Sequence, residues 1–120
     1  MANFRSQSLT KRQKLSEAIR NKYEDHVPLI IDTSELQSVK ELKKTKYVVP
    51  RDTRLAHVFF EVQRYTLGLS AHDAIFFFVR DSFYKSILPA AASTVGSIYD
   101  QYRDVDGFLY LHVRRENTFG

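Results

Sequence analysis

The residues that could act as nucleophiles, bases or metal ligands in this chain do not converge on one site. None of the 120 residues is a cysteine, which excludes disulfides, thiolate metal sites and a cysteine nucleophile. The four histidines lack the spacing of metal ligands and stand at His26, His57, His72 and His112. Ser70-Ala71-His72-Asp73 holds the three residue types of a hydrolytic triad, but sequence neighbours cannot adopt the geometry of a triad. We therefore predict that the chain is not an enzyme and needs no metal ion or other cofactor.

Asp104-Val105-Asp106-Gly107 begins like a calcium-binding loop. A loop of that type has its glycine two places later and closes with a glutamate, and this sequence has neither. Acidic residues followed by glycine are typical of tight turns. We therefore predict a turn here that leads into a strand.

Length and composition indicate one globular domain, spanning residues 1–120. Hydrophobic residues make up 43% of the chain and charged residues 27%. The net charge of +4 is compatible with nucleic acid, anionic lipid or acidic peptides as partners and does not distinguish among them. The first residues lack the apolar run of a secretory signal. The longest strongly apolar run, Ala74–Val79, has six residues, whereas a membrane span needs about twenty. We expect a protein that is soluble when made, so that any membrane attachment is added later.

The first 50 residues are predicted to hold a basic helix and two short strands. Thr10 is the expected N-cap of the helix, with Gln13 as its capping-box partner. An apolar stripe with a spacing of four residues follows at Leu15, Ile19 and Tyr23. In the strand Val27–Ile31, alternation places Val27, Leu29 and Ile31 on one face and Pro28 and Ile30 on the other. The second strand is Lys46–Pro50.

The second half of the chain continues the alternation of helices and strands. We expect a helix capped by Asp52 or Thr53 that runs to about Leu67 and stops at Gly68. A central strand follows at Ala74–Val79, and then a long connection over residues 80–92. The chain should end with a helix from Ser93, a strand Phe108–Val113 and a polar tail over residues 114–120. Periodicity alone supports an α+β domain. The order of elements matches a ubiquitin-like roll, a four-stranded mixed sheet packed on helices, here with residues 1–25 as an N-terminal helical arm.

Four stretches spread over the chain carry a family likeness. They are Lys11-Arg12 through Tyr23 together with Val27-Pro28-Leu29-Ile30; Lys44-Thr45-Lys46-Tyr47-Val48-Val49-Pro50; Asp73-Ala74-Ile75-Phe76-Phe77-Phe78-Val79; and Ile98-Tyr99 with Asp104–Tyr110 and Glu116–Gly120. In this order they resemble the autophagy ubiquitin-like modifiers of the GABARAP and microtubule-associated light-chain type. Each stretch alone is unspecific, but jointly they cover nearly the whole chain and are highly specific. The resemblance supports the ubiquitin-like fold more strongly than periodicity does.

Three departures from the family pattern indicate a divergent member. Residues 81–89 form a longer loop than the family carries. The basic run late in the helix after the second strand is thin, since Tyr65 and Thr66 follow Arg64. The segment Arg51–Ala56 holds one inserted residue relative to the pattern. These differences are expected to shift the choice of partners.

The resemblance implies a chemical role for the last residue, Gly120. In this family an activating enzyme adenylates the carboxylate of a terminal glycine, which then passes as a thioester to a conjugating enzyme and ends as an amide on phosphatidylethanolamine. Glycine suits this path because it lacks a Cβ and can thread a narrow enzyme cleft. We expect residues 114–120 to form a flexible conjugation tail and a cysteine protease to process or remove the linkage. The expected location is the cytoplasm and, after lipidation, the autophagosome membrane.

The resemblance also implies a groove beside Lys46–Pro50 for the aromatic-x-x-aliphatic motifs of cargo receptors. If this strand lies at a sheet edge, its N–H and C=O groups can pair with an extended peptide. The residues that match the aromatic pocket are Ile19, Pro28, Ile30, Lys46, Val48 and Phe108. Those that match the aliphatic pocket are Tyr47, Val49, Pro50, Leu55, Phe59 and Val62. Lys44 and Lys46 are expected to attract acidic residues beside the motif. For the motif as a whole we expect micromolar binding, a free energy of about −8 kcal/mol. Taken singly, Ile19, Val48 and Phe108 fit a core role better than a pocket role, and most of the apolar residues are expected to serve both, since the floor of a groove is also part of the core.

Alternatives remain for the basic helix and for the conjugation. The Lys and Arg side chains over residues 5–22 are compatible with contacts to anionic lipid, to the acidic tails of microtubules or to nucleic acid, and equally with a solvated face. Nucleic acid is the weakest of these, because the aromatic residues are not arranged as a stacking platform. A modifier attached to a protein, and an unconjugated peptide-binding adaptor, are the alternatives to lipid attachment.

Overall fold

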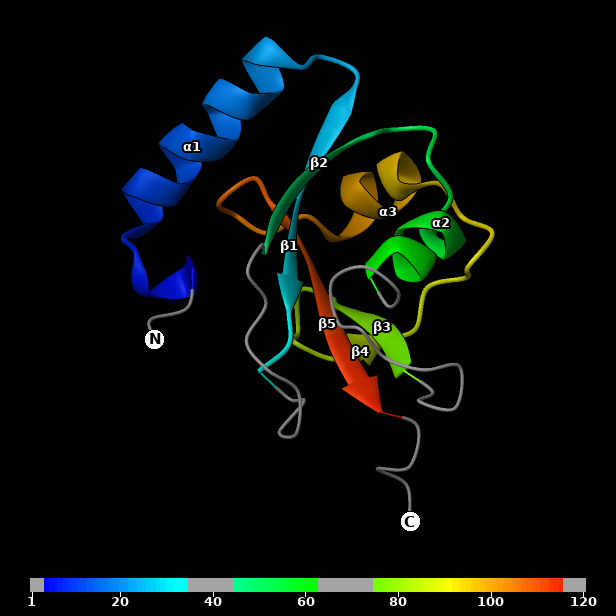
Figure 1. Cartoon of the computed structure of the whole chain (residues 1–120). Coiled ribbons are helices and arrows are strands. Elements are labelled where there is room, and N and C mark those ends of the chain that lie inside the picture. The colour runs from blue at the N-terminus through cyan, green and yellow to red at the C-terminus, as the bar shows by residue number, and fades with distance from the viewer. Residues whose placement is uncertain (1–3, 35–44, 63–74, 116–120) are drawn as a thin grey trace.

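The structure of the chain is a computed structural model that describes residues 4–34, 45–62 and 75–115. Its strands form a five-stranded mixed sheet in the order β2-β1-β5-β3-β4 (Figure 1). The strands are β1 (His26–Asp32), β2 (Lys46–Pro50), β3 (Ile75–Arg80), β4 (Ser86–Ile87) and β5 (Leu109–Arg115). The helical elements are the 3-10 turn η1 (Phe4–Ser6) and the helices α1 (Leu9–Lys22), α2 (Leu55–Glu61) and α3 (Val95–Tyr102). The fold is the predicted ubiquitin-like roll with an N-terminal helix, and it has one more strand than predicted.

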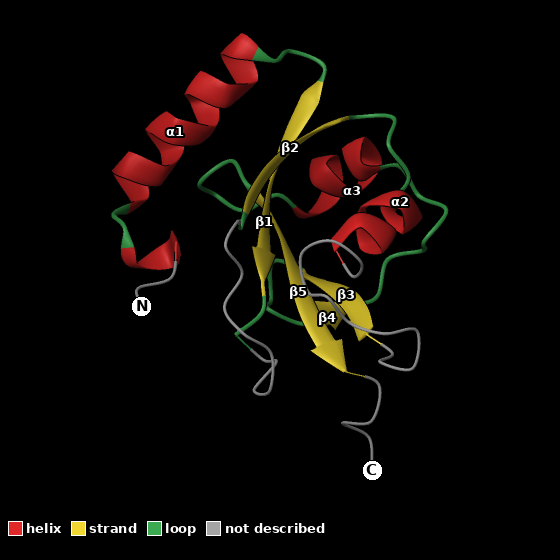
Figure 2. Cartoon of the chain, viewed as in Figure 1, coloured by secondary structure: helices red, strands yellow, loops and turns green. Residues whose placement is uncertain are grey.

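Alternation along the strands gives the sheet two covered faces. Val27, Leu29 and Ile31 of β1 belong to the main core, together with apolar side chains of α2 and α3. Ile30 belongs to a second buried cluster with Phe108 and Tyr110, against which η1 and α1 pack. The strands accordingly separate α1 from α2 and α3 (Figure 2). The predicted division of β1 into two faces is confirmed.

The register of β1 and β2 explains why a proline is tolerated inside the sheet. The backbone N–H of Ile31 donates to the carbonyl of Thr45, and that of Arg51 donates to the carbonyl of Asp25. Hydrogen-bonded pairs alternate along an antiparallel ladder. Pro28 stands opposite Val48, which is therefore a position without hydrogen bonds between the strands. The parallel pairing of β1 with β5 runs from Leu29 to Asp32, beyond Pro28. The missing N–H of the proline thus does no harm.

The helix α1 begins two residues earlier than predicted from the capping pattern. Ser8 is the N-cap, and its hydroxyl accepts a hydrogen bond from the backbone N–H of Lys11 at 3.1 Å. Thr10 lies inside the first turn of the helix. Gln13, the predicted capping partner, instead donates to the carbonyl of Val105 at 3.2 Å. Both Ser and Thr are good caps, so the residue type alone did not distinguish Ser8 from Thr10.

The start of α2 also differs from the prediction, because tertiary hydrogen bonds set it. Arg54 is the N-cap and makes no side-chain capping bond, whereas Asp52 and Thr53 were the predicted caps. The backbone of this segment pairs with the segment before α3: Leu55 N–H donates to the Ser93 carbonyl, and Val95 N–H donates to the Thr53 carbonyl. The helix α3 itself is capped by Thr94, one residue after the predicted start. The predicted end of the helix that begins at α2, near Leu67 and Gly68, lies outside the described residues.

The loop predicted over residues 80–92 contains a short strand. β4 pairs with β3 through Val79–Ile87 and Arg80–Ser86. The carboxylate of Asp81 accepts from the backbone N–H groups of Phe83 and Lys85 at 2.8 and 2.9 Å and so closes the hairpin. A strand of two residues has no periodicity, which is why the pattern did not predict it. Along β3, buried and half-buried side chains alternate.

β5 runs two residues beyond the predicted end of the strand at Val113. Arg114 and Arg115 still pair with Phe76 and Ile75 of β3. The guanidinium of Arg114 lies 4.8 Å from the centroid of the Phe78 ring and donates to the Ser86 hydroxyl. A charged residue therefore continues the strand, because its side chain covers an aromatic ring of the neighbouring strand. The predicted tail over residues 114–120 is shortened at its start, and residues 116–120 lie outside the described part of the chain.

Candidate functional site

β2 forms one edge of the described sheet and presents backbone groups outward. The sheet order places β1 on one side of β2 and no further described strand on the other. Because Tyr47 and Val49 occupy the positions of β2 that hydrogen-bond to β1, Lys46 and Val48 direct their N–H and C=O groups away from the sheet. Such an edge can accept an additional extended strand.

The residues predicted for the aromatic pocket lie together on the α1 face of this edge. Pro28 and Ile30 are the cross-strand neighbours of Val48 and Lys46. Ile30 and Phe108 are buried in one cluster, and Ile19 of α1 packs against it. Val48 is 37% exposed and Lys46 is also exposed. Thus Pro28, Ile30 and Phe108 supply a buried floor, while Ile19, Lys46 and Val48 stand at its rim.

The opposite face of β2 borders a cavity of about 390 Å³. The described residues that line it are Tyr47, Val49, Pro50, Thr53, His57, Val58, Glu61 and Val62. Four of the six residues predicted for the aliphatic pocket are among them. Leu55 and Phe59 are not: Leu55 is buried in the main core, and the ring of Phe59 packs against Phe77 with centroids 5.3 Å apart. Val58 of α2 and Val62, the C-cap of this helix, are buried beside the cavity, and the exposed His57 and Glu61 stand at its rim.

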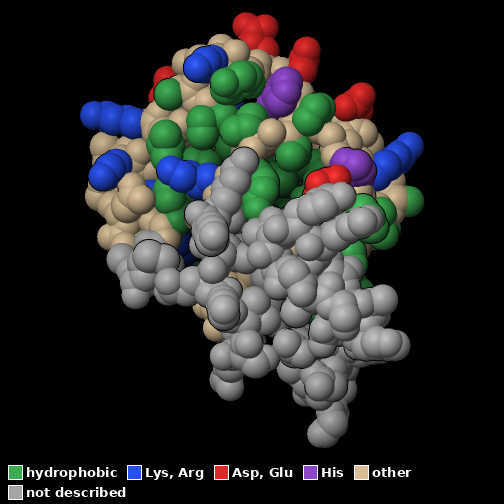
Figure 3. Space-filling model, in the orientation of Figure 1, with side chains coloured by type: hydrophobic (Ala, Val, Ile, Leu, Met, Phe, Trp, Pro, Cys, Tyr) green, Lys and Arg blue, Asp and Glu red, His purple; other side chains and the backbone are tan. Residues whose placement is uncertain are grey.

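The two faces of β2 meet on one exposed surface of the molecule. Hydrophobic side chains gather over β2 and α2, and Lys and Arg side chains lie chiefly on the α1 side (Figure 3). This distribution suits a partner that is apolar at its centre and acidic at its flanks.

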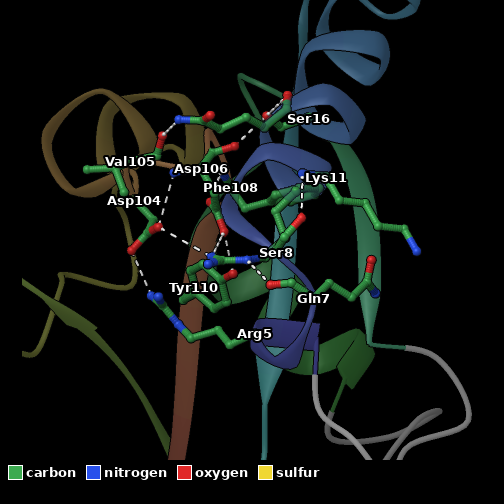
Figure 4. Close-up of polar contacts among 12 residues, drawn as sticks. Arg5, Gln7, Ser8, Lys11, Ser16, Asp104, Val105, Asp106, Phe108 and Tyr110 are labelled. Carbon is green, nitrogen blue, oxygen red and sulfur yellow. Dashed lines mark hydrogen bonds and ion pairs between the residues drawn. The ribbon is translucent and has the colours of Figure 1, made fainter.

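A buried carboxylate fixes the floor of the α1 face. Asp106 has no exposed surface. Its carboxylate accepts from the backbone N–H of Phe108 at 2.8 Å, from the Tyr110 hydroxyl at 2.5 Å and from the Arg12 guanidinium at 2.7 Å (Figure 4). Burial and the hydrogen bond to this carboxylate raise the pKa of Tyr110. These bonds join α1 to β5 and hold Phe108 in place.

The turn before β5 is compatible only with a glycine at position 107. Gly107 has a φ of +88°, and a Cβ there would lie 2.3 Å from the hydroxyl of Ser16. That hydroxyl donates to the carbonyl of Asp106, so the close approach belongs to the joint between α1 and the turn. The interpretation of residues 104–107 as a turn rather than a calcium loop agrees with this geometry. Sequence reasoning missed the role of Asp106, since a single buried acid has no spacing signature.

Comparison with known proteins identifies the family. Residues 11–120 match the family model described as "Autophagy protein Atg8 ubiquitin like". The chain belongs to the Atg8 family. Among curated relatives, Autophagy-related protein 8 of Dictyostelium discoideum is 36% identical over 93% of this chain and 88% of its own length. Autophagy-related protein 8c of Arabidopsis thaliana is 43% identical over 93% of this chain and 89% of its own. The resemblance seen in the sequence is thereby confirmed.

Solved Atg8 structures have the same fold. Trypanosoma brucei ATG8 superposes with a TM-score of 0.80 at 28% identity and covers 98% of this chain and 96% of its own. Plasmodium falciparum Atg8, solved in complex with a P. falciparum Atg3 peptide, gives a TM-score of 0.79 at 22% identity, over 95% of this chain and 96% of its own. Atg8 proteins are ubiquitin-like modifiers and adaptors rather than enzymes, so the predicted absence of catalytic function is confirmed by family membership. Lipidation and membrane association are typical of the family.

Several predicted residues cannot be placed. Lys44, Gly120 and the departures at Arg64–Thr66 lie outside the described ranges.

Within those ranges, no helix combines the length and the apolar character of a membrane span. The same residues contain no group of three His, Asp or Glu side chains arranged to hold a metal ion.

Proposed function

We propose that this Atg8-family protein is conjugated through Gly120 to phosphatidylethanolamine and binds aromatic-x-x-aliphatic peptides along β2. The observation that carries the binding proposal is the edge of β2, with an apolar floor on its α1 face and a cavity on its α2 face. In the cell the protein would act in the cytoplasm and, once lipidated, on the autophagosome membrane. There it would connect cargo receptors to the growing membrane.

The spacing of the motif follows from the geometry of an added strand. Side chains of an extended peptide alternate between two faces, so residues i and i+3 point to opposite sides. An aromatic residue directed to the α1 face therefore places the aliphatic residue three positions away on the cavity side. The exposed Lys46 beside this edge favours acidic residues next to the motif. Edge pairing supplies backbone hydrogen bonds, and the two side chains supply the specificity.

The partners proposed for conjugation are the activating and conjugating enzymes of the autophagy cascade and a deconjugating cysteine protease. The complex of Plasmodium falciparum Atg8 with an Atg3 peptide supports the proposal that the conjugating enzyme also contacts this chain through a peptide segment. Two lipid acyl chains give a stable anchor, since each buried CH₂ contributes about 0.8 kcal/mol. Contact of the basic helix α1 with microtubules stays a secondary proposal.

Peptides that differ only in spacing test the binding proposal. A peptide with the aromatic and aliphatic residues three positions apart is expected to bind with micromolar affinity. In a matched peptide of the same composition, the aromatic and aliphatic residues are two positions apart, so that both side chains point to one face of the strand. One of the two side chains then stays unburied, and binding should be weaker by about tenfold or more. Isothermal titration calorimetry gives the dissociation constants of both peptides. Equal affinities for the two spacings would contradict the proposed mode of binding.

Mass spectrometry of the cellular adduct separates lipid attachment from its alternatives. A phosphatidylethanolamine adduct at Gly120 supports the proposal. An isopeptide bond to a lysine would favour a protein modifier instead, and an unmodified chain on membranes would favour an unconjugated adaptor.

A further inference from the structure

An aromatic side chain of the protein itself lies on the α1 face of β2. Phe4, in η1, packs half-buried against the cluster of Ile30, Phe108 and Tyr110. Its ring meets the Phe108 ring edge to face, with centroids 4.9 Å apart and an interplanar angle of 73°. The Lys46 ammonium lies 5.7 Å from the centroid of the Phe4 ring. Phe4 is therefore in contact with both the floor and the rim of the aromatic pocket proposed above.

Polar contacts hold η1 in this position. The Arg5 guanidinium forms an ion pair with Asp104 at 2.7 Å and lies 4.1 Å from the centroid of the Tyr110 ring (Figure 4). The carbonyl of Gln7 accepts from Nε of Arg12 at 3.1 Å. The segment that carries Phe4 is thus fastened to α1, to β5 and to the turn before β5.

These contacts are of a kind that a ligand can replace. The Arg5 side chain is 44% exposed, and an exposed ion pair is weak and screened by salt. η1 is a single 3-10 turn and does not pair with β2 in the sheet. A bound peptide would bring an aromatic side chain, as Phe4 does, and in addition backbone hydrogen bonds to Lys46 and Val48, which η1 does not make.

We propose that Phe4 is an intramolecular competitor for the aromatic pocket, and that a peptide motif must displace it. This inference rests on the proposed peptide-binding function and adds its regulation. Only molecules in which Phe4 has left the pocket can bind the motif. The apparent association constant is therefore the intrinsic constant multiplied by the fraction of such molecules. Any event that releases the N-terminal segment, such as loss of the Arg5–Asp104 ion pair, opens the pocket.

Affinity measurements on variants of the full chain test the competition. Phe4→Ala is expected to bind the peptide of spacing three about 3- to 10-fold more tightly than the unchanged chain. Arg5→Ala should shift the affinity in the same direction by a smaller factor. Phe83→Ala is the matched control, because Phe83 is 81% exposed and lies in the β3–β4 hairpin, at the far edge of the sheet; it should leave the affinity unchanged. Weaker binding by Phe4→Ala would make Phe4 part of the pocket, and unchanged binding would remove any competition. Either outcome overturns the inference.

A fluorescent variant reports the displacement directly. The chain contains no tryptophan, so Phe4→Trp introduces a unique fluorophore at this position. The emission of the free protein is expected at the shorter wavelengths of a partly buried indole, and saturation with a tyrosine-x-x-leucine peptide should shift it to longer wavelengths. An emission that a bound peptide leaves unchanged overturns the inference while the proposed function stands. If neither the unchanged chain nor Phe4→Ala binds the peptide, the proposed function itself fails.

Discussion

Deleting Gly120 is expected to abolish transfer of the protein to phosphatidylethanolamine. In the proposed conjugation the reacting group is the carboxylate of Gly120, and the cleft of the activating enzyme would have to admit the chain that carries it. Without Gly120 the terminal residue is Phe119, whose Cβ and ring restrict the backbone angles and the width of the path. The milder variant Gly120→Ala adds one methyl group and should slow the first thioester step rather than the later ones.

The measurement is a reconstituted reaction followed by intact mass. Activating and conjugating enzymes, ATP and vesicles containing phosphatidylethanolamine are incubated with each form of the protein. The unchanged chain should gain the mass of the lipid, and Asn117→Ala, a substitution in the same tail, should behave like it. A lipid adduct on the chain without Gly120, or no thioester on the unchanged chain, would contradict the proposal.

Replacing Asp106 with alanine is expected to lower the free energy of unfolding by about 3 kcal/mol, because it leaves buried donors without an acceptor. The Phe108 N–H, the Tyr110 hydroxyl and the Arg12 guanidinium all donate to this carboxylate. Since the same bonds position Phe108, the variant should also bind the peptide motif more weakly.

Chemical denaturation with two matched variants checks this expectation. Asp106→Asn keeps an acceptor for the Phe108 N–H and should lose less stability than alanine. Asp100→Ala removes an ion pair of similar length, 2.6 Å to Arg51, but the Asp100 side chain is 55% exposed, so its loss should cost below about 1 kcal/mol. Equal losses for Asp106→Ala and Asp100→Ala would show that the buried carboxylate does not fasten α1 to β5.

The sequence predicts those features that depend on local alternation. Val27, Leu29 and Ile31 fall on one face of β1 because a strand directs successive side chains to opposite sides, and the structure places them in the main core. The family likeness predicts the order of the remaining elements. Neither the alternation nor the family likeness predicts β4, because a strand of two residues shows no periodicity. They also do not predict the extension of β5 through Arg114, because a charged residue is not expected to cover an aromatic ring such as that of Phe78.

Features that depend on distant contacts are not predictable in this way. The start of α2 is set by backbone hydrogen bonds to Ser93 and Val95 rather than by a side-chain cap. The cavity beside this helix is lined by Val58 and His57 rather than by Leu55 and Phe59, and this choice depends on how the helix packs against β2. The position of Phe4 likewise depends on residues from the other end of the chain, through its packing against the Phe108 ring and the ion pair of Arg5 with Asp104.

Amide hydrogen exchange along β2 tests the central claim, that a peptide pairs with this edge as an added strand. The register of β1 and β2 leaves the N–H groups of Lys46 and Val48 directed outward, whereas those of Tyr47 and Val49 face β1. Saturation with the peptide of spacing three should slow exchange at Lys46 and Val48 and change Tyr47 and Val49 little. Exchange that stays fast at both outward amides, with the peptide bound, would contradict the account.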